Sequence, residues 1–301
     1  MRCMLIWAPR LNRVQGSGCM WSINHEDGMT YFSFLLIFLG IPLAGVALLT
    51  WRDQKKQVFL PGILQGAPFW AVLLGHVFVA VVYTTPWDNY LVATGVWYYN
   101  PALVTGITLG WVPIEEYTFF VLQTLLTGLW LGWLLKRLPA AGEIAVNGRL
   151  MRWISVTVFG FIWIFSVVGL ALDWQEGTYL CIILAWALPP IMLQFGFGLD
   201  ILWRFRAAVI ASLVSAVTYL VIADSVAIAS GTWTIDPGQS LEVFLWGVLP
   251  LEEFIFFFVT NALIVFGMTL VLASASHVRY GQLKDKLRSV LNTAHKSEGV
   301  S

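Results

Sequence analysis

The sequence predicts an all-α membrane protein with seven transmembrane helices, organised as two parallel three-helix repeats joined by one extra helix. Three observations support this prediction: the composition, the number of long apolar segments and an internal repeat. Hydrophobic residues make up 58% of the 301 residues and charged residues 11%, and the mean hydropathy is +0.77. A chain of this composition has too little polar surface for a soluble globule of its size.

Seven segments are apolar over at least the roughly 17 residues that a membrane-spanning helix needs. They are residues 30–50, 62–85, 113–135, 153–172, 178–199, 206–229 and 250–275. Two shorter apolar pieces, 102–111 and 240–248, precede the third and the seventh segment. Each would make the following helix longer than a bilayer requires, so we expect a kinked helical extension or a re-entrant piece.

An internal repeat relates the two halves of the chain. Its matched residues are Thr30, Tyr31 and Pro42 with Thr178, Tyr179 and Pro190 at an offset of 148; Asp88, Gly95, Trp97 and Pro101 with Asp224, Gly231, Trp233 and Pro237 at 136; and Pro113, Glu115, Glu116, Phe119 and Phe120 with Pro250, Glu252, Glu253, Phe256 and Phe257 at 137. Each unit has three helices, which alone would invert the second unit. The segment 153–172 has no counterpart and restores the parallel orientation, with a pseudo-twofold axis along the membrane normal.

The repeat and the basic residues divide the chain and orient it. We expect a leader at 1–28, a first repeat at 29–137, a linker with the connecting transmembrane helix at 138–177, a second repeat at 178–275 and a tail at 276–301. Met20 and Met29 both precede the first apolar segment, so either is a candidate for the true start. Of the 17 Lys and Arg residues, 14 follow the first, third, fifth and seventh segments. Because cytoplasmic loops are rich in basic residues, we expect a multi-pass protein of the cell membrane with a cytoplasmic C-terminus.

The strongest chemical signal is a Pro-x-Glu-Glu motif that occurs at residues 113–116 and again at 250–253. Pro113 and Pro250 predict the first position of a helix, because proline needs no amide hydrogen bond there. Both motifs enter from the outer leaflet. A carboxylate at or below the membrane surface is costly to hold and therefore indicates function. The candidate catalytic residues are Glu115, Glu116, Glu252 and Glu253.

Aromatic residues accompany these acids. One follows each glutamate four positions later, and these candidates for substrate binding and cation stabilisation are Phe119, Phe120, Phe256 and Phe257. Adjacent glutamates on a helix point about 100° apart, so the two members of a pair need not share a role. A protonated carboxylic acid beside electron-rich rings suits protonation of an olefin and sheltering of the carbocation. The structural alternative is that the acids cap helices and the aromatics form an interfacial belt.

Two further pairs of matched residues lie near the motifs. Trp97 and Trp233 are either walls of the site or anchors at the membrane interface. Asp88 and Asp224 end the second and sixth segments, where they either support the Pro-x-Glu-Glu turns by hydrogen bonds or are solvated in loops.

Polar residues inside the spans have structural interpretations. We expect Gln123 and Asn261 to hydrogen-bond between helices, and His76 to be a packed, hydrogen-bonded histidine. The three cysteines are too few and too scattered for a disulfide framework or a metal site, and the chain has no dinucleotide or Walker motif. We therefore expect no metal, no cofactor and no nucleic-acid partner.

Duplicated Pro-x-Glu-Glu-x-x-x-Phe segments in a seven-span chain resemble the integral-membrane lycopene cyclases, which occur as heterodimeric pairs and as fused single chains. The resemblance covers both repeats, about residues 29–275, and maps the family's carboxylates onto Glu115, Glu116, Glu252 and Glu253. It implies a lycopene beta-cyclase that closes the acyclic ψ-ends of lycopene, or of a related acyclic carotenoid, to β-rings. The products would be γ-carotene and β-carotene, formed in the lipid membrane without net redox change and without a flavin.

A three-plus-one-plus-three membrane transporter of a small or lipophilic substrate is the alternative, because the architecture alone fits it. It predicts polar groups near the midplane, whereas the paired acids lie toward one end of the spans. A retinal-binding protein would need a lysine within a span, and no predicted span contains one. The sequence leaves open the ring type, whether one or both ends are cyclised, which glutamate is the acid, and the oligomeric state.

Overall fold

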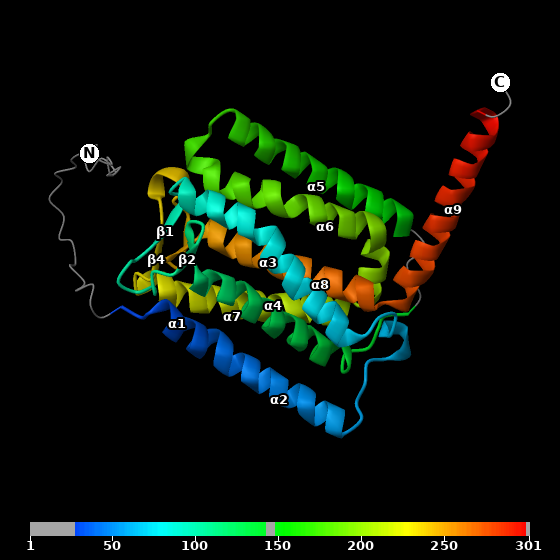
Figure 1. The fold of residues 1–301 in the computed structure, drawn as a ribbon, viewed down its shortest axis with the longest axis horizontal. Coiled ribbons are helices and arrows are strands. Elements are labelled where there is room, and N and C mark those ends of the chain that lie inside the picture. Colours follow the sequence, from blue (N-terminus) through cyan, green and yellow to red (C-terminus); the bar gives the residue numbers. More distant parts are fainter. Residues whose placement is uncertain (1–27, 143–147, 299–301) are drawn as a thin grey trace, which may run out of the picture.

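The computed structural model describes residues 28–142 and 148–298. Seven helices in this part are long and apolar enough to cross a membrane, which confirms the predicted number of spans (Figure 1). They are Tyr31–Lys55, Gly62–Ala93, Ile114–Leu135, Gly148–Ala171, Gln175–Arg204, Arg206–Ala229 and Leu251–Leu272. Nearly all of the expected leader, with Met20, lies outside the described residues.

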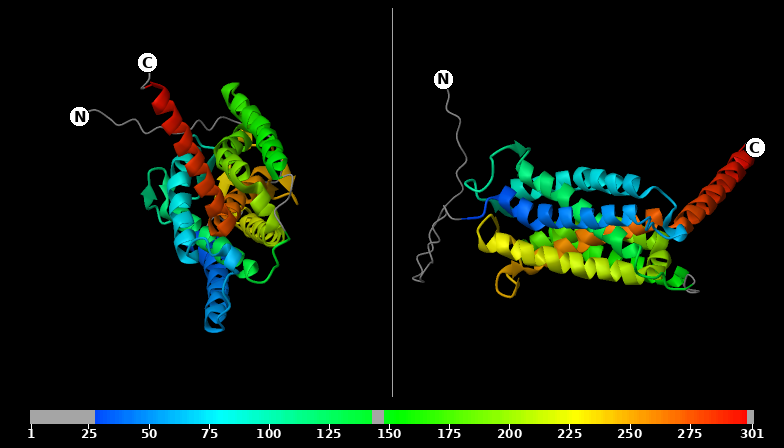
Figure 2. Two further views of the ribbon diagram at one scale, coloured as in Figure 1. Left: turned by 90° about the vertical axis from the view of Figure 1, so that its right-hand side faces the viewer. Right: turned by 90° about the horizontal axis from the view of Figure 1, so that it is seen from below.

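The first span is one rod built from α1, a π-helical segment and α2. Its parts are Tyr31–Phe34, Leu35–Gly40 and Ile41–Lys55. Single helices form the cores of the other six spans: α3 (Phe69–Ala93), α4 (Ile114–Leu135), α5 (Gly148–Ala171), α6 (Thr178–Arg204), α7 (Arg206–Ala229) and α8 (Leu251–Leu272). A last helix, α9 (Ser274–Glu298), forms most of the expected tail and projects beyond the bundle (Figures 1 and 2). Short 3-10 turns are found at Gly62–Leu64, Gln175–Gly177 and Pro237–Gln239.

Helices α4 and α8 form the centre of the bundle. Both start at the same end (Figure 1), as the parallel arrangement of the repeats predicts. Each packs against its partner and against α3 and α7, and α5 covers the outer side of α6. Gln123 on α4 donates to the Thr260 hydroxyl at 3.3 Å, and the Thr127 hydroxyl donates to Asn261 Oδ1 on α8 at 2.6 Å. The expected interhelical role of Gln123 and Asn261 is confirmed.

Prolines in two spans free backbone carbonyls that tyrosines of the other repeat then satisfy. Pro42 and Pro190 have no N–H to donate to the carbonyl four residues earlier. The Tyr219 hydroxyl on α7 donates to the first of these carbonyls, and the Tyr83 hydroxyl on α3 to the second, both at 2.9 Å. Tyr83 and Tyr219 match at the offset of 136. The contact between α3 and α6 is therefore equivalent, in the internal repeat, to the contact between α7 and the first span.

A two-stranded antiparallel sheet joins the repeats at the end where α4 and α8 begin. Strand β1 (Trp97–Tyr99) pairs with β4 (Trp233–Ile235), with Tyr98 opposite Thr234. The two strands match at the offset of 136, so a twofold rotation through this central pair exchanges them. The short sheet therefore lies on the pseudo-twofold axis that the repeat predicts.

The two short apolar pieces before the motifs are not helical extensions. They lead into hairpins: β2 (Thr108–Leu109) pairs with β3 (Val112–Pro113), and β5 (Phe244–Leu245) pairs with β6 (Leu249–Pro250). Glycines with positive φ, Gly110 and Gly247, form the turns, a conformation that glycine adopts without strain. The expectation of a kinked helix is therefore wrong, because these turn residues end the apolar pieces before a helix can continue.

Some helix boundaries also differ from the predictions. Pro113 and Pro250 are the N-cap residues of α4 and α8 and have extended backbones, one position before the predicted one. Helix α3 starts at Phe69, seven residues after the predicted start, and continues through Pro86 to Ala93. Asp88 consequently lies inside the helix and not at its end.

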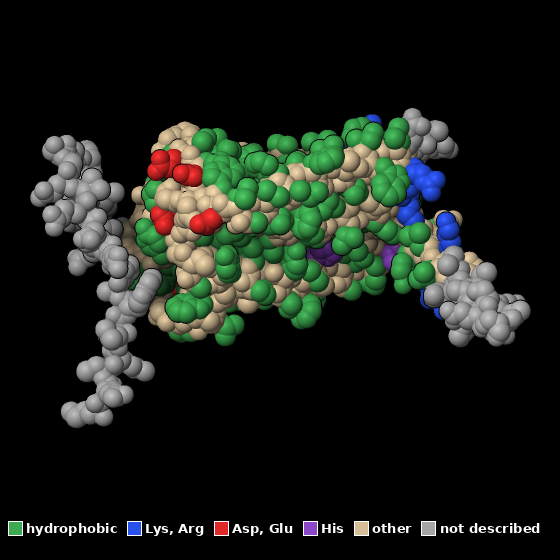
Figure 3. All heavy atoms as spheres, turned by 90° about the horizontal axis from the view of Figure 1, so that it is seen from above, with side chains coloured by type: hydrophobic (Ala, Val, Ile, Leu, Met, Phe, Trp, Pro, Cys, Tyr) green, Lys and Arg blue, Asp and Glu red, His purple; other side chains and the backbone are tan. Residues whose placement is uncertain are grey.

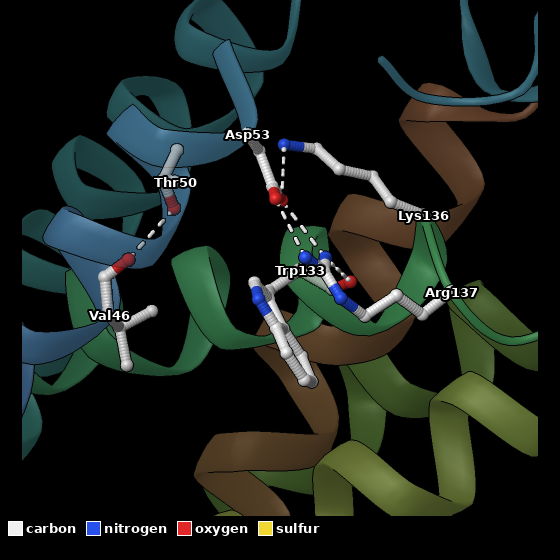
Figure 4. A network of polar contacts seen from close by, with 6 residues as sticks. All are labelled: Val46, Thr50, Asp53, Trp133, Lys136 and Arg137. Carbon is white, nitrogen blue, oxygen red and sulfur yellow. Dashed lines mark hydrogen bonds and ion pairs between the residues drawn. The ribbon is translucent and has the colours of Figure 1, made fainter. Parts of the chain in front are cut away.

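Charges separate between the two ends of the molecule (Figure 3). At the end opposite the sheet, Asp53 of α2 accepts from Arg137 at 2.7 and 2.9 Å and from Lys136 at 3.4 Å, just after α4 (Figure 4). Asp200 of α6 accepts from Arg279 at 2.5 and 2.8 Å, just after α8. In each repeat, a buried aspartate on the first helix thus binds basic residues of the segment that follows the third helix.

Candidate active site

The two glutamates of each motif point to different places. Glu115 and Glu252 are buried and accept backbone N–H groups of the preceding loops, from Thr105 at 2.6 Å and from Leu241 at 2.7 Å. These contacts hold each loop against the first turn of its helix. We call Glu115 and Glu252 the outer glutamates.

Glu116 and Glu253, the inner glutamates, point between α4 and α8 and accept hydrogen bonds from phenols. The Tyr31 hydroxyl donates to Glu116 Oε2, and the Tyr99 hydroxyl donates to the same oxygen at 3.0 Å. The Tyr179 hydroxyl donates to Glu253 Oε1 at 2.7 Å. Tyr31 and Tyr179 match in the repeat, whereas Ile235 stands at the position that matches Tyr99. The two inner glutamates therefore differ by one phenol.

The inner glutamates meet at one small cavity. Its volume is about 20 Å³, roughly the room for one water molecule. Its lining comes from both repeats and consists of Tyr31, Trp97, Tyr99, Glu116, Phe119, Asp224, Trp233, Glu253, Phe256 and Phe257. We call this cavity and its lining the acid centre.

Asp88 and Asp224 belong to the interior and not to solvated loops. Asp88 is 0% exposed and Asp224 1%, and each lies near enough to an inner glutamate for their charges to interact. Neither oxygen of Asp88, nor Oδ2 of Asp224, has a hydrogen-bond partner among the described residues. Among the described residues, Asp53 and Asp200 are the only acidic side chains that form ion pairs with Lys or Arg. The acid centre therefore gathers carboxyl groups without an ion-pair partner from the described residues.

Aromatic rings enclose the acids. Trp97 lies edge-on to Tyr179 at 5.9 Å between ring centroids, and Trp233 packs on Tyr31 at 4.9 Å. Each tryptophan thus lies against the tyrosine of the other repeat, because β1 and β4 pair side by side at the pseudo-twofold axis. Both are buried, so the alternative of interface anchors is wrong for them. Faces of such rings attract a cation.

Tyr99 is a neutral donor in this setting. It lies in the connection between the second and the third span. Burial, together with the nearby Glu116 carboxyl, raises the pKa of its phenol well above the usual value. Loss of a proton would place a second negative charge beside the glutamate in a region of low dielectric. Its hydroxyl therefore remains available to donate to Glu116.

The structure brings most of the predicted site residues together. The exceptions are the outer glutamates, the prolines that precede α4 and α8, Asp88, which does not line the acid centre, and Phe120, which lines a larger cavity. Sequence reasoning missed Tyr31, Tyr99 and Tyr179 as partners of the acids. The repeated Thr-Tyr pair at 30–31 and 178–179 carried a signal for two of them, whereas nothing in the motif spacing marked Tyr99.

Comparisons with known proteins show which family this chain resembles. The chain is 35% identical over 245 residues to a lycopene beta-cyclase of Halobacterium salinarum, and the match covers 80% of this chain and 95% of the archaeal protein. It is 36% identical over 252 residues to a bifunctional lycopene cyclase/phytoene synthase of Gibberella fujikuroi, covering 81% of this chain and 39% of the fungal protein. No family model and no solved structure matches the chain. With relatives at this identity, the chain belongs to the lycopene cyclase family.

Proposed function

We propose that this protein is a lycopene beta-cyclase that closes the acyclic ψ-ends of lycopene to β-rings within the membrane. One observation supports the proposal above all: Glu116 and Glu253, from equivalent positions of the two repeats, share one cavity walled by aromatic rings. Membership of the lycopene cyclase family favours an enzyme of carotenoid ring closure over the transporter.

Ring closure at this site needs a proton donor, a shelter for positive charge and a base. A carboxylic acid adds its proton to the terminal carbon–carbon double bond of the ψ-end, which leaves a tertiary cation. The neighbouring alkene attacks that cation, so a carbon–carbon bond closes the ring and the charge moves into it. A carboxylate then removes a ring proton and restores a double bond. The product has the same atoms and electrons as the substrate, so the reaction is an isomerisation without net redox change.

The hydrogen bonds suggest how the inner glutamates divide these roles. Two phenols donate to Glu116, which suits a carboxylate that stabilises the cation and takes up the final proton. One phenol donates to Glu253, which suits the acid that starts the reaction. The rings of Trp97, Trp233 and Phe256 line the cavity and would stabilise the intermediate by cation–π contacts.

The function is tested by expression in a bacterium that accumulates lycopene, followed by chromatography of its carotenoids. We expect lycopene to decrease and γ-carotene and β-carotene to appear. Unchanged lycopene in cells whose membranes contain normal amounts of the protein would refute the proposed function.

We also propose that the basic end of the bundle faces the cytoplasm and the acid centre the outer leaflet. The support is the separation of charges between the two ends (Figure 3), together with the excess of basic residues in cytoplasmic loops. Exposed apolar side chains, Phe78, Phe161 and Leu193 among them, lie on the helices and would contact membrane lipid.

A further inference from the structure

A second, much larger cavity lies between α3 and α6 beside the acid centre. Its volume is about 580 Å³, which is within the usual size range of ligand pockets. On α8 its lining extends from Phe256 to Val271, and the fifteen steps between them, at 1.5 Å each, make it about 22 Å long. Phe256 also lines the acid centre. The cavity is therefore long, and it shares the Phe256 ring with the acid centre.

The lining of this cavity is mostly apolar, and several of its polar side chains bond within the protein. Gln123 and Thr260 hydrogen-bond to each other, His76 bonds to the Val72 carbonyl at 2.8 Å, and the amide nitrogen of Gln194 donates to the Leu263 carbonyl at 3.0 Å. The expectation of a hydrogen-bonded His76 is confirmed. Of these groups, only Oε1 of Gln194 is buried without a hydrogen-bond partner among the described residues, so the surface suits an elongated hydrocarbon.

The pseudo-twofold axis produces a counterpart of this cavity between the first span and α7, which lie side by side (Figure 2). Of its nine lining residues, eight match residues that line the larger cavity, such as Pro42 with Pro190 and Ala216 with Ala80. Its volume is only about 260 Å³. The two cavities therefore have a common plan and different sizes.

The ninth residue has no counterpart in the lining of the larger cavity. Trp130 lines the smaller cavity, and its match in α8 is Gly267. The Trp130 ring is stacked on Trp133 at 5.0 Å, and its Nε1–H donates to Ser215 at 2.7 Å, so the indole is held in place. A Cβ atom at Gly267 would lie 2.5 Å from His76 Nε2, so the His76 ring occupies the space beside Gly267, and His76 lines the larger cavity.

Contact with the acid centre also differs. Phe256 and its neighbour Trp87 form a stack with centroids 5.4 Å apart and rings 4° from parallel, and Trp87 stacks in turn on Trp186 at 4.7 Å. This stack stands between α3, α6 and α8, where the larger cavity meets the acids. The smaller cavity shares no lining residue with the acid centre.

We propose that the cavity between α3 and α6 is the channel that binds the polyene chain of the acyclic carotenoid, and that its counterpart binds no substrate. The proposal rests on the proposed cyclase function. The two ends of lycopene are then cyclised in turn through one channel. The half-cyclised product leaves, reverses and binds again, so the monocyclic carotenoid is released as a free intermediate.

The test fills each cavity with a leucine. Ala80→Leu narrows the larger cavity and Ala216→Leu narrows the smaller one at the matched position. Gly75→Leu is a second filler of the larger cavity, because a Cβ there meets no atom within 4 Å. Gly45→Leu, on α2, is the control for Gly75→Leu. A Cβ at Gly45 also meets no atom within 4 Å, and Gly45 lines neither cavity. The residue that matches Gly45 in the second repeat is already a leucine. All four are expressed in lycopene-accumulating cells, and conversion is divided by the amount of protein in the membrane.

We expect Gly75→Leu and Ala80→Leu to lower conversion at least tenfold, and Gly45→Leu and Ala216→Leu to remain within twofold of the unchanged protein. A short time course of the unchanged protein should show γ-carotene rising before β-carotene. Equal losses in Ala80→Leu and Ala216→Leu would overturn the single channel, and full activity of both Gly75→Leu and Ala80→Leu would overturn the channel itself. An unchanged protein that forms no rings would instead refute the cyclase function.

Discussion

Replacing the inner and outer glutamates by glutamine separates proton transfer from loop attachment. Glutamine has the size of glutamate and can still accept a hydrogen bond, but it is not an acid. We expect Glu116→Gln and Glu253→Gln to abolish most ring closure while the bundle remains folded. Glu115→Gln and Glu252→Gln should leave ring closure largely intact, because these side chains accept backbone N–H groups away from the acid centre.

The expected magnitudes differ enough to be decisive. Loss of a general acid or base lowers a rate by about 10²–10⁴-fold, or about 3–5.5 kcal/mol of activation free energy. At Glu252, the hydrogen bond from Leu241 passes from a carboxyl to an amide oxygen, and even its full loss would cost only roughly 1 kcal/mol of stability. Its other carboxyl oxygen already has no partner among the described residues, so the new amide nitrogen replaces an atom that was also unpaired. The outer variants should therefore melt at a lower temperature and still turn over.

The assay uses membranes with equal amounts of each variant and follows lycopene loss and ring formation over time. Thermal unfolding in detergent reports the stability of the same preparations. The reasoning would be refuted if Glu116→Gln and Glu253→Gln kept rates within about threefold of the unchanged protein. It would also fail if the outer variants lost ring closure with unchanged stability, because the outer pair would then hold the acids.

Three further predictions follow from the same contacts. Tyr179→Phe removes the phenol hydrogen bond to Glu253, which becomes a bond to a charged group as Glu253 gives up its proton and then contributes roughly 1.5–3 kcal/mol. The rate should fall at least about tenfold, and rates at equal protein amount check this. Asp53→Asn should lower the melting temperature and leave the rate per folded molecule unchanged, because its bonds to Arg137 lie at the far end of the bundle; melting curves beside turnover check it. A reporter fused after Ser301 should be active as a cytoplasmic and inactive as a periplasmic fusion, and the reverse result would invert the proposed topology.

The sequence alone determined the architecture of this protein. Length and hydropathy identify the spans. The order of matched residues predicts two three-helix units, and the one unmatched helix between them makes these units parallel. The same repeat identified the four glutamates and the tryptophans. These features are local or periodic, so the chain displays them without any knowledge of packing.

Only the tertiary structure divided the glutamates into an inner and an outer pair. That division depends on which glutamate accepts a hydrogen bond from the loop that precedes its helix. The hairpins that place these loops are short, and the sequence pattern indicates them only weakly. The tyrosines reach the acids across 85 residues for Tyr31 and 74 for Tyr179, contacts that only the packing of helices creates. The unequal cavities were likewise decided in three dimensions, since only the packing of the helices places Trp130 in the lining of the smaller cavity.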